Sequence, residues 1–238
     1  MSRFRLLFVT ARFWPYMGGI ETHTLEVSRR LAQADVDVTV LTSDPTGQLP
    51  ETETRDGFQV RRVRAWPARR DYYFAPGVSS VVAEGGWDLM HSEGCHTFVP
   101  PLAMAAARRA HLPYVVTFHT GGHSSRLRNA MREAQWLVLR PLLVQAERWI
   151  GVSQYELDFF GERLHLPPER CFLIPNGSDL PPLDEPVQPE PGLILSVGRL
   201  ERYKGHQRIL AAMPHVRAMW PNARLLILGH GPYEDELR

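Results

Sequence analysis

Apolar runs of strand length alternate along this chain with segments whose apolar residues recur at helical spacing. The runs predict strands near 4–10, 36–42, 58–64, 88–91, 113–118, 148–152 and 170–174. The spaced segments predict helices near 20–33, 97–110, 125–146 and 153–163. Strands that alternate with helices are typical of a parallel sheet covered on both faces, so we predict an α/β fold of Rossmann-like type.

Prolines divide the chain into two predicted domains. Six of them fall in the seventeen residues 175–191, which predicts a stiff linker. Residues 1–174 would form an N-terminal Rossmann-like domain, and 192–238 the start of a second one. The second domain would contain a strand–helix–strand unit at 193–197, 205–219 and 224–228, followed by a helix with Pro232 in its first turn. Two strands cannot form a stable domain, so we expect this domain to be truncated and to need about 100 more residues.

Two stretches that carry clustered prolines and glycines are predicted to be loops. They are residues 43–57 and 65–77.

The composition excludes several classes of protein. Hydrophobic residues make up 44% and charged residues 22%, as in a soluble globular protein, and the net charge of +1 gives no reason to expect a nucleic-acid partner. Cys95 and Cys171 are far apart, so reduced thiols in a cytoplasmic protein are expected. No apolar run reaches about 18 residues, and the start of the chain enters a strand too soon for a signal peptide.

Two cations follow the strand predicted at 193–197. Gly198 ends the apolar run, Arg199 stands at the carboxyl end of the strand, and Lys204 comes just before the next helix. In an open α/β sheet ligands bind at this edge, and cations beside a helix N-terminus suit a diphosphate. Two surface cations near a turn are the alternative.

The first strand and the strand at 113–118 lead to further candidate residues. Gly18 and Gly19 precede a helix, where they let a ligand approach unpaired N–H groups, although a tight turn explains them equally well. His119 directly follows its strand and should lie at the same sheet edge. Its imidazole could donate a hydrogen bond to a ligand hydroxyl, or it could cap loop backbone groups.

A metal site is not expected. His119 and His123 form an H-x3-H pair, with His91 and His96 nearby in the chain, but Gly121-Gly122 favours a loop over the helix that this spacing needs. The sequence contains no H-E-x-x-H motif, and no Asp-x-Asp element follows a strand.

Two basic segments have alternative interpretations. Segment 125–149 carries five arginines around an apolar run, and we favour packing of its apolar side on the sheet over contact with an anionic membrane. A second basic run is interpreted as a solvated strand and loop rather than a site for an acidic acceptor. It contains Arg61, Arg62, Arg64, Arg69 and Arg70.

A set of motifs is spread along the whole chain. They are Phe13-x-Pro15-x-x-Gly18-Gly19-Ile20-Glu21, Tyr114-Val115-Val116-Thr117-Phe118-His119, Gly151-Val152-Ser153, Ile174-Pro175-Asn176-Gly177-Ser178-Asp179, Val197-Gly198-Arg199 and Leu228-Gly229-His230-Gly231-Pro232. In order and spacing they resemble those of the retaining glycosyltransferases of family 4, which have the GT-B architecture.

The resemblance implies transfer of a sugar from a nucleotide-diphosphate sugar to an acceptor hydroxyl, with retention and without a metal or other cofactor. The acceptor would be a saccharide, a lipid-linked compound or another small molecule. His119 would be the catalytic histidine, and the donor diphosphate would lie against Arg199, Lys204, Gly18 and Gly19. Further contacts to donor or acceptor are expected at Glu21, Thr120, Asn176, Gly198 and Gly229.

The resemblance also implies that part of the enzyme is missing from these 238 residues. The acidic Glu-x7-Glu motif of the family would lie beyond Arg238, so we expect the chain alone to be inactive or nearly so. Two other functions stay open. One is a non-catalytic remnant that binds a ligand or partner, and the other is a dinucleotide-dependent oxidoreductase, which the absence of G-x-G-x-x-G after the first strand disfavours. A cytoplasmic location is expected, with peripheral contact at the inner membrane face as a further hypothesis.

Overall fold

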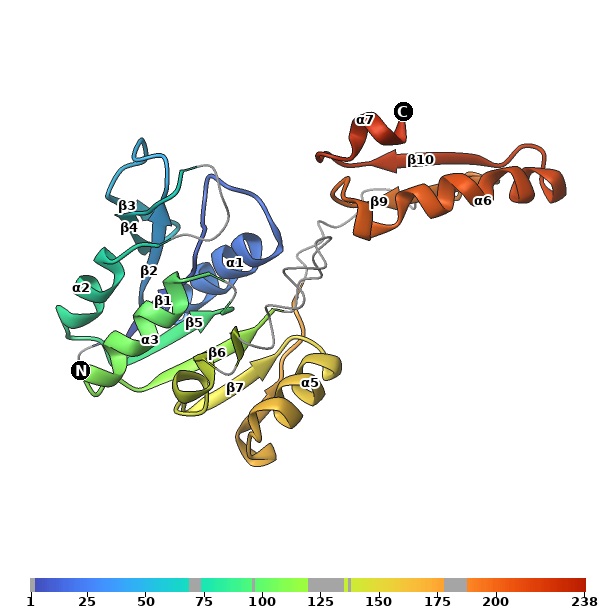
Figure 1. Ribbon diagram of the computed structural model, residues 1–238. Helices are drawn as coiled ribbons and strands as arrows, with labels where there is room; N and C mark the ends of the chain where they lie inside the picture. The colour runs from blue at the N-terminus through green and yellow to red at the C-terminus, as the bar shows by residue number, and fades with distance from the viewer. Residues whose placement is uncertain (1–2, 69–73, 96, 120–134, 137, 178–187) are drawn as a thin grey trace. The chain divides into compact units, whose positions relative to one another are not determined.

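The structure is a computed structural model that describes residues 3–68, 74–95, 97–119, 135–136, 138–177 and 188–238. The described residues up to 177 belong to one compact unit, and residues 188–238 belong to a second. Figure 1 shows both units with most of their helices and strands labelled.

The first unit is built on an eight-stranded sheet with the order β3-β4-β2-β1-β5-β6-β7-β8. The strands are β1 Arg5–Val9, β2 Asp37–Asp44, β3 Thr52–Arg55, β4 Phe58–Arg64, β5 Leu89–Glu93, β6 Tyr114–Phe118, β7 Arg148–Gly151 and β8 Cys171–Leu173. Neighbouring strands are parallel except for the antiparallel pair β3–β4. The strand order reverses at β1, which has β2 on one side and β5 on the other. The predicted Rossmann-like sheet is therefore confirmed.

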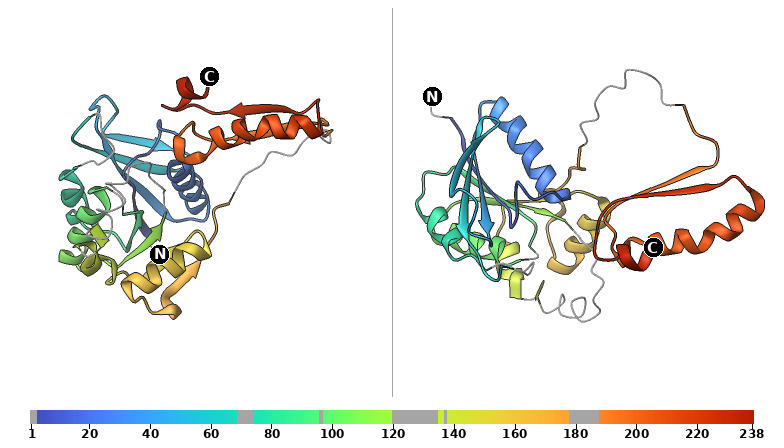
Figure 2. Two further views of the ribbon diagram at one scale, coloured as in Figure 1. Left: turned by 45° about the vertical axis from the view of Figure 1, so that its right-hand side comes forward. Right: turned by 90° about the horizontal axis from the view of Figure 1, so that it is seen from above.

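Helices cover both faces of this sheet. They are α1 Gly19–Gln33, α2 Gly77–Ala83, α3 Val99–Arg109 and α5 Gln154–Leu164, and residues 135–136 and 138–143 are also helical. Side chains alternate along β1, so Phe8 packs with Leu25 of α1, whereas Leu7 belongs to the core shared with Met104 of α3. Figure 2 shows α1 and the α2–α3 pair on opposite faces.

Two elements differ from the prediction. The segment 43–57 contains the end of β2 and all of β3. The sequence of β3, Thr-Glu-Thr-Arg, is polar throughout, as is typical of an edge strand, so it lacks the apolar alternation that would predict a strand. The segment 65–77 contains a bridge between Trp66 and Phe74, and α2 begins at its last residue. Helix α2 has only seven residues and buries three valines, which are weak helix formers, so its pattern does not predict a helix.

The helix predicted at 125–146 is described only in part, because residues 125–134 and 137 lie outside the described ranges. Within the described part, Trp136, Leu139 and Leu143 are buried in the core. This burial supports packing on the sheet. No helix within the described ranges has both the length and the apolar character needed to cross a membrane.

The second unit contains the strand–helix–strand unit and the final short helix that its sequence predicts, and also a short 3-10 helix that was not predicted. Its elements are β9 Leu193–Val197, the 3-10 helix η2 Arg202–Lys204, α6 His206–Met219, β10 Arg224–Leu228 and α7 Glu234–Leu237. β9 and β10 pair in parallel, and Pro232 lies in the turn before α7 rather than inside it. The apolar side chains that are exposed on these two strands are Leu195, Val197, Leu226 and Leu228.

Candidate active site

The carboxyl ends of β1, β5 and β6 form the candidate site of the first unit. In a doubly wound sheet, ligands bind at the carboxyl edge where the strand order reverses, which here is between β1 and β5. Glu93 is the last residue of β5, and His119 directly follows β6. Helix α1 starts after the loop that leaves β1. The structure therefore places His119 at the expected edge.

Three titratable side chains lie beside His119. The side chain of Glu93 is fully buried, and its Oε2 is hydrogen-bonded to Nε2 of His119. The other oxygen, Oε1, lies 3.4 Å from Nε2 of His91 and 3.8 Å from Nε2 of His23. The rings of His23 and His119 are 5.5 Å apart. We call these four residues the histidine cluster.

Burial sets the charges within the histidine cluster. It lowers the pKa of His23 and of His91, and this effect outweighs the nearby carboxylate, which acts in the opposite direction. Burial also acts to raise the pKa of Glu93, but the hydrogen bond with His119 and the neighbouring imidazoles outweigh it, so this pKa is lowered. Near neutral pH, Glu93 is therefore an anion among imidazoles of which His23 and His91 are neutral.

The histidine cluster also contains a set of potential metal ligands. His23, Glu93 and His119 offer ligand atoms that all lie within 4.8 Å of one another, and zinc accepts such imidazole and carboxylate ligands. The sequence analysis weighed His119 with His123, which lies outside the described ranges, and missed this grouping. The hydrogen bond between His119 and Glu93 already uses one potential ligand atom of each residue. A metal ion on either of these two atoms would have to replace that bond.

The loop between β1 and α1 is held by side chains of the sheet. The guanidinium of Arg62 donates hydrogen bonds to the carbonyl oxygens of Trp14 (3.0 Å) and Pro50 (3.1 Å) and pairs with Glu53 at 2.7 Å. Its side chain is only 2% exposed. For Arg62 the interpretation as a solvated residue is therefore wrong, because β4 turns this arginine under the loop.

Gly18, Gly19 and Glu21 lie at the start of α1. A Cβ at Gly18 would come within 2.2 Å of Oε2 of Glu21, so the absence of a side chain lets Glu21 fold back over the start of the helix. The guanidinium Nε of Arg12 lies 3.7 Å from the other oxygen of Glu21. A Cβ at Gly19 would meet no atom of the described residues within 4 Å. At the helix start, the space beside Gly19 therefore contains no atom of the described residues, whereas the side chain of Glu21 fills the space beside Gly18.

One predicted contact residue is not brought to the histidine cluster, and another lies outside the described ranges. Asn176 is exposed and follows the edge strand β8, which is separated from β6 by β7. Thr120 lies outside the described ranges. Their predicted contacts with donor or acceptor stay predictions.

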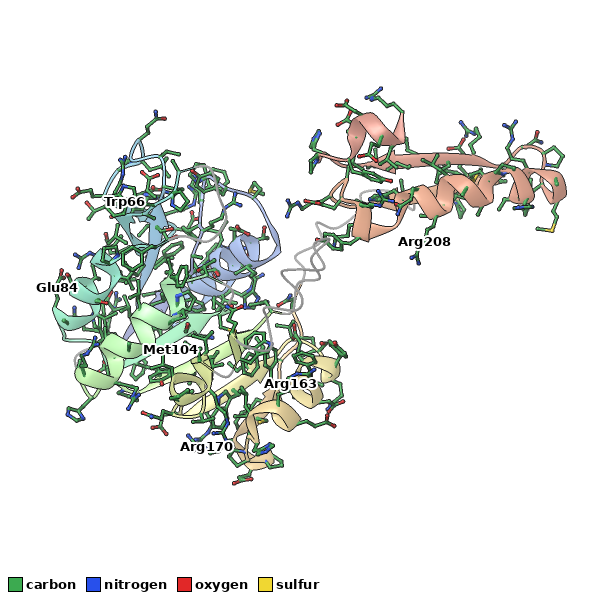
Figure 3. The ribbon with its side chains drawn as sticks, viewed as in Figure 1. Trp66, Glu84, Met104, Arg163, Arg170 and Arg208 are labelled. Atoms are coloured by element: carbon green, nitrogen blue, oxygen red, sulfur yellow. The ribbon has the colours of Figure 1, made fainter. Side chains whose placement is uncertain are left out.

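In the second unit, cations flank the start of α6. Arg199 follows β9, its side chain is 69% exposed, and it pairs with Glu201 at 3.1 Å. Lys204 ends η2 with its Nζ 5.2 Å from the ring centre of Tyr203. Gly205, with φ of +84°, takes the left-handed conformation that joins η2 to α6. Figure 3 shows that the side chain of Arg208, in the first turns of α6, also projects outward.

His206 holds the loop that carries Arg199, although sequence reasoning did not single it out. Its ring is buried, with Nε2 3.2 Å from the backbone oxygen of Arg199 and Nδ1 3.0 Å from Oγ of Ser196. Because a backbone oxygen only accepts, Nε2 carries the proton and Nδ1 accepts from the serine. The only sequence signal for this role is a histidine at the first position of the helix.

Gly198 and Gly229 pack against each other instead of facing open space. A Cβ at Gly229 would lie 1.9 Å from the backbone oxygen of Gly198, and the N–H of Gly198 bonds the backbone oxygen of Leu228 at 2.9 Å. Position 229 therefore needs glycine because the two backbone segments approach too closely for a side chain. Gly198 itself lies beside Arg199 at the carboxyl edge of β9.

The fold and the site define the class of protein. A doubly wound sheet with polar side chains at its reversal point, followed by a second parallel strand–helix–strand unit, is typical of α/β proteins that bind ligands at carboxyl sheet edges. Residues 17–181 match the family described as Glycosyltransferase Family 4, and residues 184–238 match the family described as Glycosyl transferases group 1. The chain belongs to Glycosyltransferase Family 4.

Curated relatives are similar over most of this chain. A phosphatidyl-myo-inositol mannosyltransferase of Mycolicibacterium smegmatis is 31% identical over 236 residues, which cover 93% of this chain and 57% of that protein. A GDP-mannose:cellobiosyl-diphosphopolyprenol alpha-mannosyltransferase of Xanthomonas oryzae pv. oryzae is 28% identical, with 94% and 60% covered. The chain thus spans less than two thirds of the length of these relatives.

Solved structures share the fold. A sucrose-phosphate synthase from Thermosynechococcus elongatus matches with a TM-score of 0.69 and 21% identity, covering 95% of this chain and 62% of that one. The Anabaena protein HepE, solved in complex with UDP and glucose, matches with a TM-score of 0.66 and 16% identity, covering 97% and 62%. These similarities support the α/β Rossmann-like fold seen here.

Proposed function

We propose that this chain is the acceptor-side domain and the beginning of the donor-binding domain of a retaining glycosyltransferase. The observation that carries the proposal is the family match over residues 17–181, a segment that includes His119 directly after β6. The enzyme would move a sugar from a nucleotide-diphosphate sugar to an acceptor hydroxyl. Because the chain spans 57% of its mycobacterial relative, we propose that it is only part of the enzyme and has little activity by itself.

The second unit would bind the diphosphate of the donor. Departure of the nucleotide develops negative charge on a phosphate oxygen, which must be stabilised by a metal ion or by fixed cations and N–H groups. Arg199, Lys204 and the N–H groups at the start of α6 supply such groups. We therefore propose transfer that needs no metal ion. The ion pair of Arg199 with Glu201 holds the guanidinium before the donor arrives, and the diphosphate would compete for it.

The first unit would meet the sugar and the acceptor. In retaining transfer, the bond between C1 of the sugar and the phosphate oxygen breaks, and the acceptor oxygen forms a new bond to C1 on the same face. The acceptor proton passes to the phosphate oxygen that leaves. His119 would hydrogen-bond the donor sugar during this step, with Gly19 leaving room beside the helix start.

The names of relatives suggest which donors and acceptors to test. One relative is named for GDP-mannose and a diphosphopolyprenol acceptor, another for phosphatidyl-myo-inositol, and the Anabaena structure contains UDP. We propose a UDP- or GDP-linked sugar as the donor and an acceptor that carries a free hydroxyl, lipid-linked acceptors included. Sedimentation with liposomes tests peripheral membrane contact, and equal sedimentation with and without anionic lipid would contradict such contact.

Calorimetric titration of the chain with UDP and GDP, in buffer with EDTA, tests the donor site. Arg199→Ala and Lys204→Ala should each weaken binding about tenfold or more, because each removes a charge-assisted contact of about 1.5–3 kcal/mol. Arg217→Ala is the matched control, since Arg217 is exposed at the opposite end of α6. Binding that requires added Mg²⁺ would contradict the metal-free proposal. Binding of NAD but of neither nucleotide would favour an oxidoreductase.

A further inference from the structure

We propose that Glu93 is a positioning residue for His119: its Oε2 accepts the proton on Nε2 of His119 and so fixes the tautomer and the orientation of the ring. This role deepens the proposed function, because it concerns the same histidine. The evidence lies in the contacts of the histidine cluster, and the experiment below reads the tautomer directly without any donor.

The position of Glu93 is set by the sheet. β5 and β6 are parallel neighbours in which Glu93 is aligned with Thr117, so a side chain at the end of β5 lies beside the residues that follow β6. His119 comes two residues after Thr117. Neither side chain depends on a long loop for its placement, since one ends a core strand and the other directly follows one. The contact is therefore built into the register of two core strands.

The contacts within the histidine cluster distinguish His119 from the other two imidazoles. Nε2 of His91 is hydrogen-bonded to Oγ1 of Thr117 at 2.7 Å, and it lies 3.4 Å from Glu93. Nε2 of His23 is 3.8 Å from the same carboxylate. Oε1 of Glu93 is buried and has no hydrogen-bond partner among the described residues. Within the histidine cluster, the hydrogen bond of Glu93 is therefore made to His119.

The chemistry of the two groups assigns the proton. An ionised carboxylate only accepts hydrogen bonds, so the Nε2 of His119 that faces it must be protonated. In the neutral ring this leaves Nδ1 as the nitrogen that accepts a hydrogen bond. A carboxylate behind an imidazole holds the ring in one tautomer and one orientation, as it does in hydrolase triads. Glu93 would act on the reaction only through His119.

A metal ion held by the same residues is the competing explanation. A metal on Nε2 of His119 requires that nitrogen to be unprotonated, because the ligand atom donates its lone pair. The hydrogen bond and the metal therefore exclude each other at Nε2. This exclusion makes the two explanations distinguishable by a single spectroscopic measurement.

Nitrogen-15 NMR of the histidine rings in the 238-residue chain tests the proposal, with the His119 signals assigned from a His119→Asn variant. We expect a protonated Nε2 and an unprotonated Nδ1 in the unmodified chain. Glu93→Gln should keep this pattern, because the amide oxygen still accepts the proton, whereas Glu93→Leu should lose it. Glu84→Leu is the control, since Glu84 is an exposed glutamate at the periphery of the first unit (Figure 3) and should leave the pattern unchanged.

Several results would overturn the proposal. A proton on Nδ1 of His119 in the unmodified chain would do so, even if the leucine variant failed to fold. An unchanged tautomer in a folded Glu93→Leu variant would also do so, and so would a metal-type shift of Nε2 that appears with stoichiometric Zn²⁺ and is removed by EDTA. Failure of the nucleotide titrations would refute the donor site and leave the tautomer result standing.

Discussion

Replacing Arg62 with methionine tests whether the sheet holds the loop that leads to Gly18 and Gly19. The substitution removes the guanidinium that bonds the carbonyl oxygens of Trp14 and Pro50 and pairs with Glu53. Methionine keeps an apolar stem of similar length, so most of the packing is retained. The effect should therefore report the lost polar contacts.

The expected loss of stability is about 3 kcal/mol. Each of the two carbonyl oxygens loses a part-buried hydrogen bond worth about 1–1.5 kcal/mol. The ion pair adds less than a fully buried pair would, because Glu53 is 26% exposed and regains water when its partner leaves. With a slope near 2 kcal/mol per molar urea, the unfolding midpoint should fall by about 1.5 M.

Urea unfolding followed by tryptophan fluorescence measures this change. Of the six tryptophans only Trp220 lies in the second unit, so the signal reports mainly on the first. Arg61→Met is the matched control, because its neighbouring guanidinium pairs with the exposed Glu84 and should be worth less than about 1 kcal/mol. Equal shifts for the Arg61 and Arg62 variants would refute the idea that burial under the loop gives Arg62 its role.

Three further predictions concern other parts of the chain. Ser153→Ala removes the side-chain cap of α5 and should cost about 1 kcal/mol in the same urea assay, with Ser153→Asp restoring it. Gly229→Ala should unfold or rearrange the second unit, because its Cβ would overlap the backbone of Gly198; normal hydrogen-exchange protection of β9 would contradict this. Stability of the first unit should fall as the pH drops from 7 to 5.5. Folding lowers the pKa of His23 and of His91, so near pH 6.5 the unfolded chain takes up protons that the folded chain does not. Each such proton lowers the free energy of unfolding by at most about 1.4 kcal/mol per pH unit. His91→Gln should reduce this slope, and an unchanged slope would contradict it.

Core strands were predictable because each is buried on both faces, and a continuous apolar run is a strong signal. β1 and β6 were predicted within one residue at each end. Edge elements carry no such signal: β3 is polar throughout and pairs only with β4, and the short helix α2 is stabilised by three buried valines rather than by its own propensity. Their formation depends on tertiary contacts that a local pattern does not contain.

The candidate site was predictable only where a polar residue directly follows an apolar run. His119 and Arg199 fit that rule, and the structure places each at the carboxyl end of its strand. Glu93 was missed because the polar residues of β5 suggested that the strand ended at 91, whereas it continues to Glu93. The contact between Glu93 and His119 depends on the register of two strands that are distant in sequence, and no local spacing encodes it.

The stability of Glu93→Leu separates a role in folding from a role in chemistry. Burial of the charged Glu93 side chain costs free energy, and a leucine of similar volume would be buried without that cost. His119 can lose its partner without becoming an unpaired buried charge, because an imidazole can be neutral. If Glu93 serves only to position His119, the leucine variant should unfold within about 1 kcal/mol of the unmodified chain, or at higher urea, while its tautomer is lost. A loss above about 3 kcal/mol in the leucine variant would mean that the carboxylate holds β5 and β6 together and that its effect on the histidine is secondary.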